Sequence, residues 1–365
     1  MSITETGSVS LPSVGSSRTS DELRASGRRQ VSRVLNRVSA QDTVTLDPDL
    51  VLYDHSRPGA DRSPMGAALG RLKHDRVAIA AIAIIFLLVA GALLAPLVVR
   101  AVGAPGPDVQ SFAAVNQFGQ PSGPSGHHIF GVDKLGRDVF SRVVYGARVS
   151  LEVGFGATAL SLSIGTVVGL VAGYFRGLVD SLLSRIVDLF LAFPTLLLAL
   201  GISSACSVGR GCVAGTIRPG RVLVIAVIGL ASWPLLARVI RGQVLSLRER
   251  EFIEAAHGIG SGTFRVLFKE LLPNLVGPLI VYATLGIAIS IGFEAALSFL
   301  GVGIRPPTPS WGQMISDSVG TFDTAWWYTL FPGLALMTTV LAFNLLGDAL
   351  HDALNPRQYR SANGE

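Results

Sequence analysis

The sequence predicts an all-α polytopic membrane protein with six transmembrane helices, from its composition and from the lengths of its apolar stretches. Of its 365 residues, 49% are hydrophobic and only 15% are charged, and the mean hydropathy is +0.51. A soluble domain of this length is normally less apolar and more highly charged. Six stretches approach the roughly 20 apolar residues that a helix needs to cross a bilayer: residues 77–99, 149–174, 181–203, 222–240, 275–297 and 329–350.

The first apolar stretch begins far from Met1 and is longer than the apolar part of a cleaved signal peptide, so we expect it to remain as an anchor. The residues before it, 1 to about 65, are rich in Ser, Arg, Asp and Gly. That composition cannot bury enough apolar surface to offset chain entropy, which predicts a largely disordered tail. The alternative for residues 23–39 is a weakly amphipathic helix lying on anionic lipid headgroups.

Lys and Arg near helix ends are retained on the cytoplasmic side of a membrane. Eleven of the thirty Lys and Arg residues precede the first stretch. These basic residues place the N-terminus in the cytoplasm, and an even number of crossings places the C-terminus on the same side. The chain is expected in the plasma membrane. This asymmetry accounts for the formal net charge of +5, which therefore gives no support to nucleic-acid binding.

The stretches and their connections predict an order of segments along the chain. The central loop at residues 246–274 belongs to a five-helix core and is expected in the cytoplasm. The predicted segments are a cytoplasmic tail at 1–70, the first transmembrane helix at 71–100, an extracytoplasmic loop at 101–148, the core at 149–350 and a cytoplasmic tail at 351–365.

The two cysteines, Cys206 and Cys212, fall in the short outside loop that is expected after the third helix. The flexible residues between them allow closure, and an outward-facing pair can oxidise. A disulfide and two unpaired thiols remain equal alternatives. A metal site is less favoured, because no nearby His or acidic residue completes a ligand set.

Motifs for chemistry are missing from the sequence. It contains no G-x-x-x-x-G-K-[ST] segment to cradle nucleotide phosphates, and its six histidines form neither an H-E-x-x-H pair nor a nucleophile triad. We therefore expect no catalytic residue, no metal and no cofactor in this chain.

The loop at 246–274 predicts two short helices around a glycine turn. Ser246 with Glu249 is expected to form a capping box, and Ser261 to cap the second helix. Gly258 and Gly260 separate the two. The apolar positions that would give the helices a common face are Phe252, Ala255, Ala256, Phe264, Leu267, Phe268 and Leu271.

An apolar face on a cytoplasmic loop needs a cover. One interpretation is that it lies in a groove of another protein, which would allow force to pass through the contact. The alternative is that the loop packs on its own helix ends. The residues by themselves leave these alternatives about equal.

Charged side chains inside the apolar stretches are expected to face the interior of the bundle or a water-filled cavity. Arg185 and Asp188 are three positions apart, so they share a helix face, and Arg238 is another candidate partner of Asp188. Packing of the helices is the favoured role for this group, and a gate is the alternative. Glu294 would bond either local backbone or the amino group of a substrate.

The outer segment from Arg305 to Trp311 is stiffened by prolines, including Pro306 and Pro307, which fix backbone angles. It suits a rigid docking surface. The alternative for Trp311 is to anchor the chain at the membrane interface together with Trp326 and Trp327.

Part of the cytoplasmic loop resembles the EAA signature of ABC importer permeases. The matching residues are Glu254, Ala255, Ala256, Gly260, Leu272 and Pro273. Residues 237–249, 172–194, 128–151 and 298–313 are similar to blocks of the dipeptide and oligopeptide C-type subunits, with Val132 replacing the usual Thr. The resemblance covers about residues 70–360.

This resemblance implies a type I ABC importer permease that moves dipeptides or short oligopeptides by alternating access. The matching loop residues would dock on an ATPase, which would carry the ATP and Mg. The implied partners are a homologous second permease subunit, one or two ATPase subunits or a fused one, an extracytoplasmic peptide-binding protein, and membrane lipid. The resemblance also implies that the binding protein contacts Arg305, Pro306, Pro307 and Trp311.

Three other functions are alternatives. Nickel is the nearest alternative cargo for the same machine, because nickel permeases share much of this pattern. A secondary transporter would be expected to carry charged, broken helices at the membrane midplane in paired repeats. A membrane-bound enzyme would need a catalytic constellation, which the sequence does not provide.

Overall fold

The structure is a computed structural model that describes residues 66, 70–207 and 220–354. All of them belong to one compact unit, Arg62–Glu365. Nearly all of the predicted tail at 1–70 and most of the tail at 351–365 lie outside the described residues. Within the described ranges the regular elements are helices, with only isolated β-bridges between loops, which confirms the all-α prediction.

The first predicted crossing is divided into two helices. Helix α3 (Arg76–Leu93) begins at Asp75, whose side chain accepts a hydrogen bond from the backbone N–H of Val77, and α4 (Ala95–Ala101) follows after Leu94. Pro96 sits in the first turn of α4, where a proline is tolerated because that turn has no intrahelical use for its N–H. The prediction of one continuous helix over 77–99 is therefore wrong, because the helix is interrupted at Leu94.

Helix α5 (Val139–Tyr174) begins at Val139, ten residues before the apolar stretch at 149–174. Asp138 caps it, accepting a hydrogen bond of 2.8 Å from the N–H of Ser141. At about 1.5 Å per residue α5 is longer than a bilayer core of about 30 Å, so its first turns stand outside the membrane.

The third predicted crossing, 181–203, is not a single straight helix. It consists of α6 (Leu178–Leu191) and α7 (Thr195–Ser207), which are bent by 81°. Pro194, immediately before α7, has no N–H to donate, which favours an interruption at this point.

Helices α5 and α8 (Arg221–Leu247) are parallel and tightly packed. Glycines of α5, which have no side chain, allow this close approach. Glycines later in α5 face residues later in α8, which shows that the two helices run in the same direction. The facing pairs include Gly156 with Ile225, Gly165 with Leu236, Gly169 with Ile240, and Gly173 with Val244.

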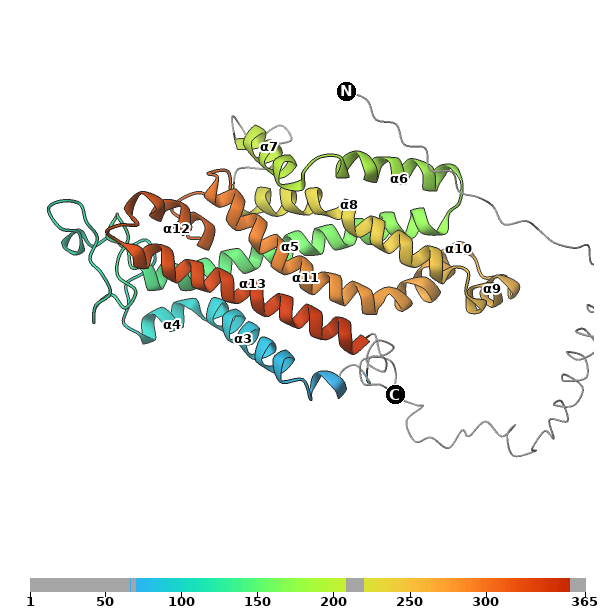
Figure 1. The fold of residues 1–365 in the computed structure, drawn as a ribbon, viewed down its shortest axis with the longest axis horizontal. Coiled ribbons are helices and arrows are strands. Elements are labelled where there is room, and N and C mark those ends of the chain that lie inside the picture. The colour runs from blue at the N-terminus through green and yellow to red at the C-terminus, as the bar shows by residue number, and fades with distance from the viewer. Residues whose placement is uncertain (1–65, 67–69, 208–219, 355–365) are drawn as a thin grey trace, which may run out of the picture. The chain divides into compact units, whose positions relative to one another are not determined.

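This parallel arrangement determines how the bent pair crosses the membrane. Five helices of the described residues are long and apolar enough to span, and α6 with α7 would make a sixth. Because α5 and α8 run in the same direction, the chain between them must return across the bilayer. Figure 1 shows α6 near the end of α5 and α7 near the start of α8. The bent pair is therefore the remaining crossing, and six crossings agree with the prediction.

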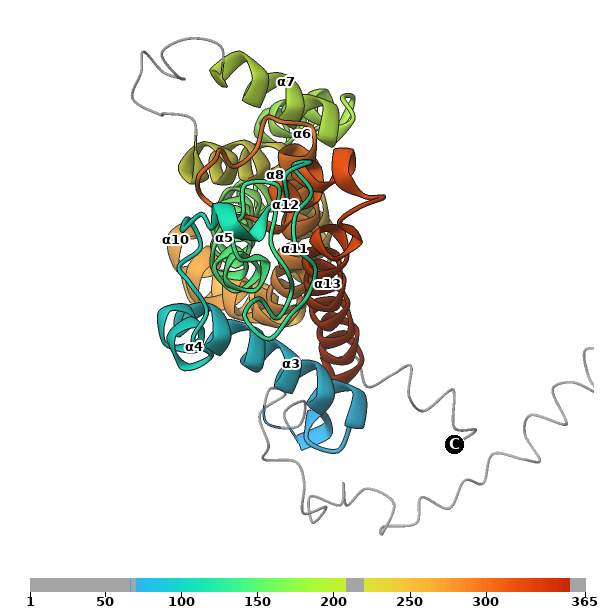
Figure 2. The same ribbon diagram turned by 90° about the vertical axis from the view of Figure 1, so that its left-hand side faces the viewer.

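The rest of the core is antiparallel. Helix α11 (Leu272–Phe299) runs antiparallel to α5, with Gly154 facing Ile291 and Gly286 facing Thr158, and α13 (Trp326–Leu354) runs antiparallel to α11. The short helix α12 (Trp311–Ser318) lies between the last two. In both Figure 1 and Figure 2, α3 and the α6–α7 pair lie on opposite sides of the bundle.

Candidate functional site

The predicted coupling loop lies at the end of the bundle opposite α12 (Figure 1). Helix α9 (Glu251–Gly258) follows α8, and Gly260 turns the chain with a φ of 77°. The short α10 (Thr263–Arg265) and a π-helical segment, η3 (Val266–Leu271), then continue directly into α11. The second arm is thus the start of a membrane helix, not the separate short helix that was predicted.

Neither predicted cap is present. Ser246 lies inside α8, so it cannot form a capping box with Glu249, and Arg250 precedes α9 without a side-chain cap. Gly262, not Ser261, precedes α10. The sequence pattern was misleading because α8 continues beyond the apolar stretch on which its predicted end was based.

One face of the loop packs on the helix ends. Ile253 and Ala256 of α9 are buried together with Val266 and Leu271, against Val244 of α8. This contact stabilises the loop by removing apolar surface from water. It agrees with the interpretation that the loop packs on its own helices.

Polar contacts also attach this loop to the end of α5. The Nη1 of Arg248 donates to the carbonyl of Gly173 at 2.8 Å, and the hydroxyl of Tyr174 lies 3.2 Å from Nε2 of His257. A displacement of the loop would therefore be transmitted to α5 as well as to α8 and α11.

The other face of the loop remains open, and we call it the open apolar face: Phe252, Ile259, Phe264 and Phe268. Ile259 is 77% exposed and Phe264 is 74% exposed. The rings of Phe264 and Phe268 are 4.4 Å apart. The predicted stripe is therefore divided, because Leu267 and Leu271 face inward while the two Phe residues face outward. Packing on the chain's own helix ends therefore accounts for the inward residues, and docking on another protein stays a prediction for the outward ones.

The signature residues gather in this loop. Glu254 and Ala255 are exposed and Ala256 is buried, while Gly260 makes the turn. Leu272 and Pro273 begin α11, with Leu272 half-buried and Pro273 exposed. Their docking on an ATPase stays a prediction.

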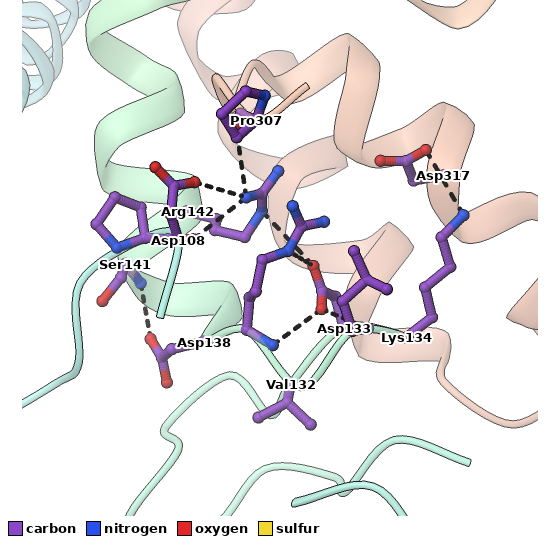
Figure 3. A network of polar contacts seen from close by, with 12 residues as sticks. Asp108, Val132, Asp133, Lys134, Asp138, Ser141, Arg142, Pro307 and Asp317 are labelled. Carbon is purple, nitrogen blue, oxygen red and sulfur yellow. Dashed lines mark hydrogen bonds and ion pairs between the residues drawn. The ribbon is translucent and has the colours of Figure 1, made fainter. Parts of the chain in front are cut away.

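At the other end of the molecule, buried charges organise the outer loops (Figure 3). The carboxylate of Asp133 accepts hydrogen bonds from the backbone N–H groups of Leu135 and Arg137 and from Nε of Arg137 at 2.6 Å. Asp138 caps α5 and also bonds Nδ1 of His128 at 2.9 Å. The acidic residues of this block therefore hold the loop conformation.

Arg142 joins three segments of the outer surface. Its side chain is buried, and its Nη1 donates to the carbonyls of Pro107 at 3.2 Å and Pro307 at 3.5 Å. It also lies 3.7 Å from Asp133 and 3.6 Å from Asp108 (Figure 3). Arg142 was not among the predicted site residues, although an arginine so close to the start of a long apolar helix is a signal that could have identified it.

The predicted docking residues of the outer segment are not equivalent. Arg305, Pro306 and Pro307 are exposed. Trp311 is completely buried, and its Nε1 donates to the carbonyl of Val143 at 3.0 Å. Trp311 therefore neither offers a contact surface nor anchors the chain at the membrane interface in this conformation. Of the tryptophans expected as interface anchors, Trp326 is half exposed and Trp327 is buried.

Glu294 of α11 bonds two side-chain hydroxyls, not the local backbone groups that were one of its two expected partners. It is fully buried and accepts hydrogen bonds from the hydroxyls of Ser150 at 2.9 Å and Ser298 at 2.8 Å. Ser298 in turn accepts a hydrogen bond from the N–H of Ile304 at 3.1 Å. This chain of contacts fixes the outer segment to α5 and α11.

The predicted polar pair forms between different residues from those first paired. Nη2 of Arg238 lies 2.5 Å from Asp188, whereas Arg185 is exposed and forms no ion pair within the described residues. A second link between α6 and α8, from Arg241 to Asp180, was not predicted. Choosing these partners requires the orientation of α6 against α8, which sequence spacing does not give.

Cys206 is buried in the last turn of α7, not in a loop. Cys212 lies outside the described residues, so the disulfide stays a prediction. Among the described residues, no group of three or more His, Cys, Asp and Glu side chains is arranged to hold a metal ion.

Comparison with known proteins shows which family the chain is similar to. Residues 165–360 match the model named "Binding-protein-dependent transport system inner membrane component". The chain is 42% identical to the dipeptide transport system permease protein DppC of Alkalihalophilus pseudofirmus, over 81% of this chain and 90% of that protein. It is 36% identical to the glutathione transport system permease protein GsiD of Pectobacterium atrosepticum, over 81% of this chain and 92% of that protein.

A putative peptide transport system permease protein of Brucella abortus is 37% identical, over 83% of this chain and 95% of that protein. The family model names a transport component and not a catalytic enzyme. The chain belongs to the family of binding-protein-dependent transport system inner membrane components.

Proposed function

We propose that this chain is a permease subunit of an ATP-driven importer of dipeptides and short oligopeptides. The observation that carries the proposal is the open apolar face, which is exposed at the end of the bundle and needs a protein cover. The cargo is inferred from relatives that are named as dipeptide, peptide and glutathione permeases.

The proposed complex has partners on both sides of the membrane. A homologous second permease subunit would complete the translocation path within the bilayer. Two ATPase subunits, or one fused chain, would bind ATP and Mg and receive the open apolar face. A peptide-binding protein would dock outside on the surface that includes Arg305, Pro306 and Pro307. Lipid would cover the remaining membrane surface.

The proposed orientation places both termini and the coupling loop in the cytoplasm. Arg248, Arg250, Arg265 and Lys269 all lie in or beside this loop, and basic residues near helix ends are retained on the cytoplasmic side. Six crossings then return the C-terminal end of α13 to the same side as the N-terminal end of α3.

In the proposed cycle, closure of the ATPases on ATP displaces the coupling loop. The loop contacts α5, α8 and α11, so its movement would tilt these helices together and alternate access between the two sides. ATP on one side and a loaded binding protein on the other must each favour one state, since only differential binding shifts such an equilibrium.

The test of cargo is uptake into proteoliposomes that contain the complete complex and its binding protein. A labelled dipeptide, labelled glutathione and radioactive nickel would be supplied separately, with and without ATP. We expect ATP-dependent uptake of the dipeptide and none of nickel. Uptake of nickel but not of peptide would overturn the peptide assignment, and ATP-independent uptake would overturn the ATP-driven mechanism.

The test of docking uses Ile259→Ser and Phe264→Ser. Both side chains are largely exposed, so the changes should leave the folded chain intact while weakening co-purification of the ATPase. Phe112→Ser is the matched control, because Phe112 is 79% exposed on the opposite, outer surface. Full ATPase retention by both loop variants would contradict the proposed docking.

A further inference from the structure

The bent pair α6–α7 is a membrane crossing whose helix is interrupted deep in the membrane. The pair forms one crossing, and the break at Ala192, Phe193 and Pro194 falls between helices of 14 and 13 residues. With arms so similar in length, the break lies near the middle of the bilayer. All three residues of the break are exposed on this chain.

Lipid is an unsuitable cover for this break. The hydrocarbon core contains no water to satisfy free backbone groups, so non-helical backbone occurs at this depth only against protein or beside a water-filled cavity. The exposed break therefore identifies a part of the surface that another protein covers or that borders an aqueous path.

A second observation on the same side of the bundle leads to the same conclusion. The side chains of Asp188 and Arg238, which pair between α6 and α8, are 52% and 54% exposed. Asp188 is four positions before Ala192, so it lies on the same face of α6 as the start of the break. Ionised side chains within spanning segments are costly in lipid and face protein or water.

The opposite side of the bundle differs in each of these respects. From Val77 to Leu93, α3 is an uninterrupted helix, and its exposed large side chains, such as Phe86 and Leu87, are apolar. Such a surface is suited to lipid. α3 lies across the bundle from α6 and α7 (Figure 2).

We propose that the α6–α7 side of this chain, centred on the break at Ala192–Pro194, is the surface against which the second permease subunit packs. This inference rests on the proposed pairing of two permeases. Only a partner that itself spans the membrane can reach the break, which excludes the binding protein and the ATPases. The N–H groups of Ala192 and Phe193 already donate to the carbonyls of Asp188 and Phe190, at 3.0 and 3.3 Å. The partner's surface must therefore provide hydrogen-bonding groups only for the remaining backbone groups of the break and for the Asp188–Arg238 pair.

The test compares two phenylalanines with the same substitution. The photoreactive residue p-benzoylphenylalanine would replace Phe193 at the break, which is 55% exposed, or Phe86 on α3, which is 73% exposed. Each full-length variant would be expressed with its complete transporter and irradiated in membranes, and its adducts identified by mass spectrometry. We expect Phe193 to yield an adduct with the second permease at least several times more often than Phe86, which should label lipid.

Three results would overturn the inference: lipid adducts alone at Phe193, equal permease adducts at both positions, or adducts between two copies of this chain. If the Phe193 variant does not assemble, the same replacement at Leu197 of α7, which is 61% exposed, supplies the measurement. The cross-link does not require transport. A wrong cargo assignment would therefore leave the adduct in place, whereas peptide uptake without the adduct would reject this surface alone.

Discussion

The carboxylate of Asp180 on α6 receives two hydrogen bonds from the guanidinium of Arg241 on α8, with Nε 2.6 Å from one oxygen and Nη2 2.8 Å from the other. The hydroxyl of Ser184 adds a third contact at 3.2 Å. A planar guanidinium matches a carboxylate in this two-point geometry, which fixes orientation as well as distance. The pair therefore holds α6, the first helix of the bent crossing, against α8.

Replacing Asp180 by Asn should weaken this attachment. The side chain keeps one acceptor oxygen but loses the charge and the second acceptor, and hydrogen bonds to charged groups contribute about 1.5 to 3 kcal/mol each. We expect a lower midpoint of thermal unfolding in detergent. Glu249→Gln is the control, because its pair with Arg176 is 3.4 Å long and largely exposed, so its effect should be about 0 to 1 kcal/mol. Equal shifts for the two variants would contradict this role.

Gly169 should not tolerate even a methyl group. A Cβ atom at Gly169 would lie 2.8 Å from both the carbonyl oxygen of Ala237 and Cβ of Ile240, so Gly169→Ala must push α5 away from α8. Overpacking of this kind costs about 1 to 3 kcal/mol. Gly201→Ala on α7 is the control, because nothing lies within 4 Å of its added Cβ, and it should be neutral or stabilising. Thermal unfolding of both variants measures the difference, and an unaffected Gly169→Ala would show that the helices are less tightly packed.

Replacing Arg142 by Lys should loosen the outer surface. A single ammonium on a flexible stem cannot reproduce the contacts of the guanidinium with Pro107, Pro307 and Asp133. Hydrogen exchange should increase in the segment around Pro307. Lys134→Ala removes only the 3.7 Å pair with Asp317, which is partly exposed, and should change exchange little. Unchanged exchange in Arg142→Lys would mean that other contacts hold this segment.

Sequence periodicity and length were sufficient for the class of fold and for the approximate position of each crossing. They were insufficient at the boundaries. α5 extends beyond its apolar stretch because Asp138 caps it and because Arg142, which is polar in sequence, is buried with partners. The bend at Pro194 was missed because α6 and α7 together have the length and apolarity of one straight helix.

The candidate site was predicted where a local motif specifies it and missed where distant residues meet. The turn at Gly260 follows from glycine itself, since its left-handed backbone is strained for other residues. Trp311 was predicted as a docking contact or an interface anchor. Its burial was missed because it depends on Val143 of α5, which is far away in sequence. The Asp180–Arg241 pair depends in the same way on how α6 packs against α8.

Gly260 allows the sharpest test of the coupling loop, because a substitution there changes the backbone conformation without a steric clash of the added side chain. Its φ is 77°, and nothing lies within 4 Å of an added Cβ. Gly260→Ala should therefore act through backbone strain alone, about 1 to 2 kcal/mol. We expect it to abolish peptide uptake without preventing membrane insertion, because a shifted turn would displace the open apolar face. Glu254→Ala, at the exposed signature position, should likewise abolish uptake.

Gly258→Ala is the matched control for Gly260→Ala. Gly258 is also without neighbours within 4 Å of an added Cβ, but it ends α9 and has no positive φ, so alanine should be tolerated. Gly260→Asn should recover part of the uptake, because asparagine adopts the left-handed conformation more readily than alanine. The order of activity among the single variants, measured as labelled peptide uptake at equal membrane abundance, should be Gly258→Ala, then Gly260→Asn, then Gly260→Ala. If Gly260→Ala transports as well as Gly258→Ala, the conformation of this turn is not what couples the loop to its ATPase.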